Sequence, residues 1–577
     1  MMSRAVAGGQ RRQMALRRWM PVALIVLAGG FAHGVVLLTD YRLWDGWAYS
    51  LWLSDPQQTP FLWRLFDEIG RPLDALYWLP FRGLASPHIA AKWAGVVAWV
   101  AHAVFMHDCL RRRYWLGSGL ATAVAILVVT CPVFRPLGEL SIWMNTCAVA
   151  LFWLGLSILT RVSDGQGGGW RGPLRLVASA LLFVSFNLNS NLVFFYGVAA
   201  AAVALRVGRV GWRDAARELI GCVRRFPEAA ALPVLFWLWK SWFTPSHGAY
   251  LDYNRPTLAP EVLWNGYVVL VANFLLPFAC KPLMRVGVLI ASVLAGLLLT
   301  SRLHAAGFVG SRFAASDRWP PALVIGAAAL VLLGAASFPY VCVGQFLADD
   351  AWFGRNNILT PLPLSLLAVG TIAYGSRKAV PTRSRLWFAL CVALAAVWGA
   401  SSLLGYLRLQ AFGVKQLSIR AHLRDVIETR APAVIQLRDY AVMPDGIPYY
   451  PPIVWTAMAA CCDGVPRTLV LDSRVAAPDQ QIVEDGRKQT LMGVVMMTSD
   501  NVRQAIQQST VPYAFGDIPD RGPQAVLAVR STDSPWSSEA IAVRYLMGLW
   551  SSPAASSELV REFLTAEVVE LEPVGSP

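Results

Sequence analysis

Residues 20–39 read MPVALIVLAGGFAHGVVLLT, an apolar run of 20 residues without Asp, Glu, Lys or Arg. About 20 apolar residues are enough to cross the hydrocarbon layer of a bilayer as one helix. The run follows Arg11, Arg12, Arg17 and Arg18 and lacks a clear small-residue cleavage site. We therefore expect a retained signal anchor, with a cleaved signal peptide as the alternative.

The apolar character continues far beyond this run. Hydrophobic residues make up 56% of the 577 residues and charged residues only 15%, which is typical of a polytopic membrane protein. Runs of spanning length recur as far as about residue 405, so we expect an α-helical polytopic membrane protein with about 11–12 transmembrane helices. The expected spans are 20–39, 88–106, 117–133, 142–160, 173–187, 192–206, 227–243, 264–280, 286–301, 321–338, 361–375 and 386–405.

The positions of Lys and Arg predict the orientation. Basic residues crowd the N-terminal tail, residues 1–19, and two further loops: Arg111, Arg112 and Arg113 after the second span, and Arg206, Arg209, Arg213, Arg217, Arg224 and Arg225 after the sixth. Cytoplasmic loops carry such an excess. The tail is therefore predicted to be cytoplasmic, and loop 40–87 to face the periplasm or the cell exterior of a bacterial inner (plasma) membrane.

One segment leaves the topology open. A full crossing by 264–280 would export Arg302, Arg312 and Arg318, against the same rule. If this segment is re-entrant or interfacial, the chain crosses about eleven times and the C-terminus is external. The alternative is about twelve crossings with a cytoplasmic C-terminus.

The chain divides by charge near residue 410. Residues 411–577 hold 14 Lys and Arg against 19 Asp and Glu, whereas residues 1–410, which contain the polytopic domain 20–410, carry a net charge of +19. The basic excess follows from the cytoplasmic loop ends, so it does not indicate a nucleic-acid partner. Residues 411–577 are predicted to form a soluble α/β domain. Its expected strands are 433–437, 468–471, 525–529 and 568–571, and its expected helices 413–430, 498–508, 535–550 and 556–565.

Motifs of common enzyme classes are missing from the sequence. The C-terminal part contains no GxGxxG, GxxxxGK[ST], GxSxG or HExxH motif, and the nine cysteines form no CxxC pair or Cys/His cluster, so no metal ligands are assigned. Cys461 and Cys462 could form a vicinal disulfide or stay two thiols at a helix end. His33 and His102 lie within apolar runs, and we expect hydrogen-bonded core residues rather than ligands.

Acidic residues gather in loop 40–87, which carries Asp40, Asp45, Asp55, Asp67, Glu68 and Asp74. Carboxylates between two spans need water, a cation or a chemical task. Asp45 lies between Trp44 and Trp47, and in a short surface helix over 43–53 it would share a face with Tyr49. Such rings suit a sugar, and equally an interfacial aromatic belt.

Two arginines at predicted external positions could bind a phosphate. Arg71 follows Gly70 in loop 40–87, and Arg355 lies in loop 345–361 with Asp349, Asp350, Trp352, Asn356 and Asn357. Arginine can hold a phosphate bidentately. The alternatives are a salt bridge from Arg71 to Glu68 or Asp74, and an ordinary polar loop around Arg355.

These features together resemble the glycosyltransferase-C (GT-C) superfamily, whose members move sugars from polyprenyl-phosphate carriers at the outer membrane face. Asp45 with Gly70-Arg71-Pro72-Leu73 is similar to the O-antigen glucosyltransferases of that superfamily. The motif likeness covers residues 20–90, and the remainder is similar only in architecture. Those enzymes tend to carry an adjacent acidic pair where this chain has a single Asp45, so the use of a divalent cation stays open.

The resemblance implies transfer of a sugar from a polyprenyl-phosphate donor to a glycan or lipid-linked acceptor by inverting displacement. Asp45 is the first candidate base and Asp40 the second, Arg71 and Arg355 would bind the donor phosphate, and Trp44, Trp47 and Tyr49 the sugar or lipid. The rivals are a transporter, flippase or polymerase of lipid-linked saccharides, and a non-catalytic envelope protein.

Overall fold

The structure is a computed structural model of the whole chain. It describes residues 19–42, 46–54, 59–112, 116, 118–134, 139–165, 168–188, 190–247, 256–275, 322–345, 353–376, 383–430, 434–439, 458, 469–472, 525–531 and 538–570. In these ranges six helices are long and apolar enough to cross a membrane: Trp19–Leu38, Pro87–Leu110, Leu140–Ser163, Ser190–Gly208, Leu323–Val341 and Trp387–Arg430. Ser118–Thr130 and Pro361–Ile372 are shorter apolar helices. The predicted polytopic helical architecture is confirmed.

The predicted spans and the helices correspond closely. Every predicted span overlaps a helix except 286–301, which lies outside the described residues. After the first span, which ends in η1 (Gly34–Leu38), the bundle contains α4 (Pro87–Leu110), α5 (Ser118–Thr130), α6 (Trp143–Ser163), α7 (Arg171–Ser185), α8 (Ser190–Val210), α10 (Pro227–Phe243), α11 (Pro260–Leu275), α13 (Ala322–Val341), α14 (Pro361–Ser376) and α15 (Arg383–Arg430).

The core of the bundle forms around α5. This helix is apolar on all sides, and from Leu120 to Thr130 every residue is buried, as expected for a helix enclosed by others. Its neighbours are α4, α14 and α15. His33 is buried here and hydrogen-bonded to the Tyr406 hydroxyl and the Val129 carbonyl, and the His102 ring contacts the Trp99 carbonyl. The prediction that His33 and His102 are core residues is confirmed.

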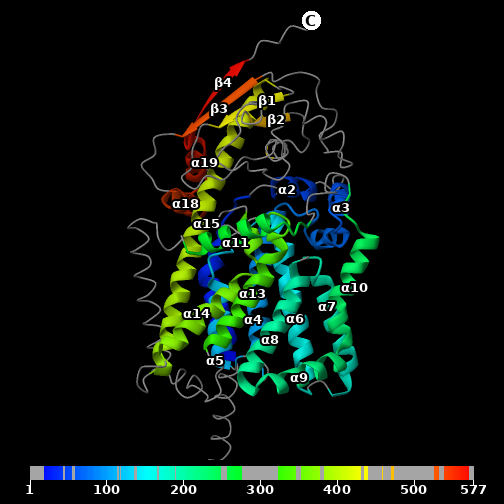
Figure 1. The fold of residues 1–577 in the computed structure, drawn as a ribbon. Coiled ribbons are helices and arrows are strands. Elements are labelled where there is room, and N and C mark those ends of the chain that lie inside the picture. The colour runs from blue at the N-terminus through cyan, green and yellow to red at the C-terminus, as the bar shows by residue number, and fades with distance from the viewer. Residues whose placement is uncertain are drawn as a thin grey trace, which may run out of the picture.

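The two ends of the bundle differ (Figure 1). At one end lie α2 (Gly46–Ser54) and α3 (Thr59–Glu68), and at the opposite end lies α9 (Trp212–Arg225), which joins α8 to α10. Loop 40–87 continues from α3 into the 3-10 helix η2 (Pro72–Phe81). We call the end with α2 and α3 the α2 end.

The C-terminal sheet also lies beyond the α2 end (Figure 1). Its strand order is β2-β1-β3-β4, formed by β1 (Val434–Asp439), β2 (Leu469–Asp472), β3 (Ala525–Ser531) and β4 (Leu564–Glu570). β1 pairs in parallel with β2 and β3, while β4 runs antiparallel to β3. The helices α18 (Ser538–Ser551) and α19 (Pro553–Glu562) complete the described part of an α/β unit, as predicted. The expected helix 498–508 and Cys461 with Cys462 lie outside the described residues.

A single helix connects the bundle to this sheet. α15 runs unbroken from Arg383 to Arg430, 48 residues, so the boundary expected at residue 410 falls inside a helix. The expected span 386–405 and the expected helix 413–430 are two parts of this one element. At a rise of about 1.5 Å per residue it is about 72 Å long.

Candidate functional site

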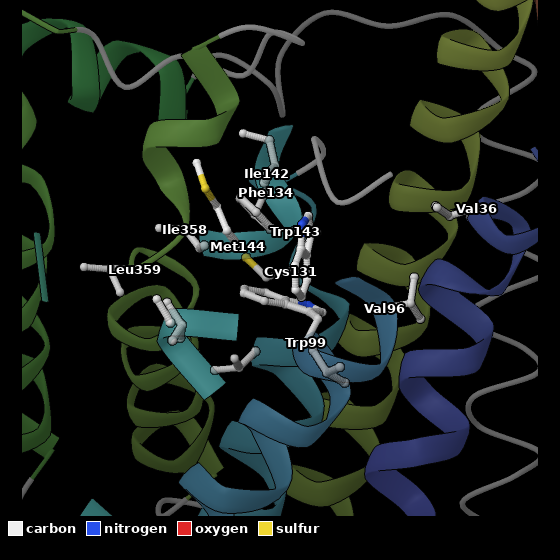
Figure 2. Close-up of a cluster of buried hydrophobic side chains, with 14 of the residues drawn as sticks. Val36, Val96, Trp99, Cys131, Phe134, Ile142, Trp143, Met144, Ile358 and Leu359 are labelled. Carbon is white, nitrogen blue, oxygen red and sulfur yellow. The ribbon is translucent and has the colours of Figure 1, made fainter. Parts of the chain in front are cut away.

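Aromatic side chains fix loop 40–87 on the bundle. Tyr49 of α2 lies 4.7 Å from Trp78 of η2 between ring centroids and stacks on Phe66 of α3 at 6.4 Å. Trp143, at the start of α6, meets Phe81 edge to face at 4.8 Å and also contacts Trp78. Burial of several aromatic rings in one cluster accounts for the defined place of these short elements. Figure 2 shows Trp143 close to Trp99 and Phe134, where the cluster continues into the core.

The first candidate base lies just outside the described part of the chain. Trp44 and Asp45 are not among the described residues, but Gly46, which follows Asp45, begins α2 and is buried. A carboxylate oxygen of Glu139 lies so close to Gly46 that a Cβ there would come within 2.3 Å of it. The buried start of α2 therefore lies against the Glu139 carboxylate.

The sequence prediction missed Glu139. Its side chain is only 1% exposed, it caps η4 (Leu140–Ile142), and it lies within electrostatic range of Lys92 of α4. A buried carboxylate at the end of a bundle is costly unless it has partners or a task. Its position between the expected spans 117–133 and 142–160 was the available signal. A lone acid in a short loop has no periodic pattern that would have marked it.

The second candidate base, Asp40, is held by the C-terminal helices. Its oxygen Oδ1 accepts a hydrogen bond from the Gln410 amide of α15 at 2.8 Å, and Oδ2 accepts one from the Tyr545 hydroxyl of α18 at 2.5 Å. The Asp40 backbone N–H donates to Gln410 at 3.1 Å. Each carboxylate oxygen thus has a donor from residues more than 360 positions away in the sequence.

Arg71 and Asp74 form an ion pair, one of the two expected alternatives. The guanidinium lies 2.6 Å from the Asp74 carboxylate, which is 1% exposed. Lys240 of α10 is within electrostatic range of both groups. Burial raises the pKa of Asp74 to about 6, although the positive charges of Arg71 and Lys240 act in the opposite direction. The site therefore combines two cations with one carboxyl group that is costly to ionise.

Arg355 approaches the same place from another part of the sequence. It lies in η8 (Phe353–Asn357), before α14, and the Tyr340 hydroxyl at the end of α13 is in electrostatic range of both Arg355 and Arg71. Ser190 of α8 is hydrogen-bonded to that hydroxyl at 3.2 Å. The Asn357 amide donates to the Val133 carbonyl at 3.0 Å and so ties η8 to the loop after α5. The Tyr340 hydroxyl thus lies within electrostatic range of both predicted phosphate-binding arginines, and Lys240 lies within electrostatic range of one of them, Arg71.

The predicted sugar-binding rings are packed inside the protein. Trp47 is 2% exposed and lies between the guanidinium groups of Arg42, at 4.6 Å, and Arg420, at 5.7 Å. Tyr49 is 5% exposed within the aromatic cluster. A role as platforms would require both rings to be uncovered when a substrate enters, whereas a role in fixing α2 requires no change.

The described residues contain no group of three or more His, Cys, Asp or Glu side chains arranged to hold a metal ion. Asp40 uses its oxygens for Gln410 and Tyr545, and Asp349 and Asp350 of loop 345–361 lie outside the described ranges, as does Asp55 of the first loop.

Comparison with known proteins gives only distant similarity. No protein-family model and no curated protein matches the sequence. Among solved structures, the chain is similar to the archaeal oligosaccharyltransferase AglB from Archaeoglobus fulgidus, in complex with an inhibitory peptide and a dolichol-phosphate, at 11% identity and a TM-score of 0.39 over 94% of this chain and 72% of that one. It is also similar to ArnT from Cupriavidus metallidurans bound to undecaprenyl phosphate, at 12% identity and a TM-score of 0.39 over 89% of this chain and 93% of that one.

Proposed function

We propose that the protein is a GT-C-type integral membrane glycosyltransferase that transfers a sugar from a polyprenyl-phosphate donor to a cell-envelope glycan or lipid-linked acceptor. The observation that carries the proposal is a set of neighbouring charges: Lys240 lies within electrostatic range of Arg71 and Asp74, and Arg71 and Arg355 both lie within electrostatic range of the Tyr340 hydroxyl. These three cations come from separate elements and lie in a region with one carboxyl group, Asp74, that is costly to ionise. Together they suit the phosphate of such a donor at membrane level.

The three cations suit the leaving group of an inverting displacement. The acceptor hydroxyl attacks the anomeric carbon, the bond from that carbon to the phosphate oxygen breaks, and the electron pair of this bond stays on the lipid phosphate. Negative charge therefore grows on the phosphate as the reaction proceeds. Preorganised cations stabilise this growing charge more than they stabilise the ground state, which lowers the barrier.

Asp45 is the proposed base, because it precedes Gly46 at the buried start of α2. Its carboxylate takes the proton of the attacking hydroxyl and becomes neutral. Glu139, packed against Gly46, would orient the acceptor hydroxyl or the sugar by accepting a hydrogen bond.

The decisive test is sugar transfer by membranes that contain Asp45→Asn. With a panel of polyprenyl-phosphate hexoses and native envelope acceptors, we expect a loss of about 10²–10⁴-fold in rate, as is usual for a lost general base. The matched control is Asp67→Asn, in the same loop, because the Asp67 side chain is 64% exposed and its ion pair within the described residues is with His247, at 3.6 Å. Full activity of Asp45→Asn at normal protein levels would remove Asp45 as the base.

A second variant pair tests the set of cations Arg71, Lys240 and Arg355, which we call the cation site because it presents positive charges to the donor phosphate. Arg71→Lys keeps the charge and loses the planar donor fork, so we expect a weaker apparent affinity for the donor with a smaller change in turnover. Arg355→Gln removes a charge and should lower both the apparent affinity for the donor and the turnover. If both variants behave like the wild type, the phosphate does not bind at this site.

A further inference from the structure

Residues 39–42 connect the first span to Asp45, and the structure holds this segment from two sides. On the bundle side, the Lys92 ammonium of α4 donates to the Tyr41 carbonyl at 2.7 Å and to the carbonyl and hydroxyl oxygens of Thr39, both at 3.2 Å. Lys92 also lies 3.9 Å above the Tyr41 ring. All of these contacts flank Asp40 without touching its carboxylate.

On the other side, Asp40 binds residues of the C-terminal part. Gln410 makes two hydrogen bonds with it, one to the backbone N–H and one to the side chain, which fixes the orientation of the residue. Tyr545 makes the third. Burial and the neighbouring Asp40 charge raise the pKa of the Tyr545 phenol, so the phenol stays protonated and remains a donor. Hydrogen bonds to an ionised acceptor are about twice as strong as neutral ones.

The helix that carries Tyr545 is itself anchored on α15. Arg408 of α15 lies 2.8 Å from Glu539 at the start of α18, and both side chains are mostly buried. Gly413 of α15 lies directly under Tyr41, where a Cβ would come within 2.5 Å of the Tyr41 Cβ. The loop segment, α15 and α18 thus form one packed unit.

We propose that Asp40 is a positioning residue that fastens the segment leading to Asp45 onto α15 and α18, so that the C-terminal region is a structural part of the site. Asp40 does not take the proton; its two oxygens hold Gln410 and Tyr545. The consequence for activity depends on the proposed function, whereas the consequence for local order does not.

The test separates a positioning role from a base. Asp40→Asn keeps an acceptor for Gln410 and preserves size, so activity should fall by no more than about fivefold. Asp40→Ala removes both side-chain hydrogen bonds, so activity should fall by tenfold or more. The double variant Asp40→Ala/Tyr545→Phe should lose about as much activity, because the second change has no bond left to break. A base at position 40 would instead make Asp40→Asn as inactive as Asp45→Asn.

Hydrogen exchange gives a readout that needs no assay of sugar transfer. In the full-length protein in nanodiscs, Tyr545→Phe should raise amide exchange by about tenfold both in α18 and in residues 39–42, since one shared bond orders both. The matched control is Glu539→Gln, which weakens the ion pair of Arg408 with Glu539 between α15 and α18 and should raise exchange in α18 alone. Unchanged exchange of residues 39–42 in Tyr545→Phe would overturn the proposal even if the protein transfers sugar, and coupled exchange would support it even if it does not.

Discussion

Asp74 shows how one buried carboxyl group can set the charge of the cation site. Its pKa is raised from 3.8 to about 6 on folding, so the folded protein binds this proton more tightly than the unfolded chain. The contribution of Asp74 to stability is therefore most favourable at pH below 3.8 and is lost as the pH rises through about 6. Above that pH the carboxylate offsets one of the positive charges beside it.

This leads to a pH prediction for anion binding. Below pH 6 Asp74 becomes neutral, so Arg71 and Lys240 act on an anion without a competing carboxylate, and binding of a polyprenyl-phosphate hexose, a phosphodiester whose single charge does not change in this range, should tighten. Asp74→Asn should tighten binding at pH 7.5 by about three- to tenfold, the effect of removing one like charge near the ligand, and should flatten the profile between about pH 5 and 7. Binding to protein in nanodiscs, measured by thermophoresis, checks this, and an unaltered pH profile in Asp74→Asn would contradict it.

For single residues, the sequence indicated which side chains have suitable chemistry better than it indicated which residues they contact. Arg71 and Arg355 are marked by chemistry alone, and the Arg71–Asp74 pair follows from a separation of three residues. The Glu139 contact with Gly46 and the Tyr545 contact with Asp40 depend on how distant elements pack. No local pattern encodes such contacts, so Glu139 was missed and Asp40 remained a candidate base.

The turn between α3 and η2 is an element whose shape depends on a glycine. Gly70 has a φ of +73°, and a Cβ there would come within 2.6 Å of the Thr244 carbonyl, just after α10. The Ser246 hydroxyl donates to the Ile69 carbonyl at 2.9 Å, and the His247 N–H donates to the Glu68 carbonyl at 2.9 Å. The turn thus joins Arg71 to the end of the helix that carries Lys240.

Gly70→Ala should therefore do more than strain the backbone. A residue with a Cβ pays about 1 kcal/mol for the left-handed conformation, and here it must also displace the chain at Thr244. Gly83→Ala is the matched control, since Gly83 has a φ of +75° and no atom within 4 Å of the added Cβ. We expect a larger drop in melting temperature, and weaker donor binding, for Gly70→Ala than for Gly83→Ala in detergent-solubilised protein. Equal effects of the two changes would mean that the contact with Thr244 contributes nothing.

The secondary structure was predictable where its pattern is local. β1, β2 and β3 lie where β-branched apolar runs predicted them, whereas β4 begins at Leu564, four residues before the expected strand 568–571. The expected helix 556–565 extended over the first residues of this strand, but α19 ends at Glu562, and Leu564 to Ala566 pair with β3 in the sheet. The unity of α15 was missed because its composition changes from apolar to polar near residue 410, although no proline interrupts it.

For the molecule as a whole, the remaining prediction is its orientation in the membrane. α2, α3 and the C-terminal sheet lie at one end and the arginine-rich α9 at the other (Figure 1), which fits a cytoplasmic α9 by the positive-inside rule. The apolar residues of α9, including Trp212 and Ile220, are exposed beside its arginines, as in helices that lie on a membrane surface.

Cys222 of α9 offers a direct measurement, because its side chain is exposed. In a variant with this single cysteine, a membrane-impermeant maleimide should label the protein only after the inner membrane is opened. In a matched variant with Asp67→Cys as the single cysteine, labelling should occur in intact spheroplasts. The reverse pattern would place loop 40–87 in the cytoplasm and exclude an outer-face reaction.

The continuity of α15 has a mechanical consequence. About 30 Å of its length of about 72 Å suffices for the hydrocarbon layer, so the helix extends well past the membrane as a stiff rod. A flexible linker would let the sheet change its orientation independently of the bundle, but a continuous helix transmits tilt and rotation from one of its ends to the other. A force that tilts the sheet would therefore also tilt the part of α15 that carries Gln410 and the part that lies in the bundle.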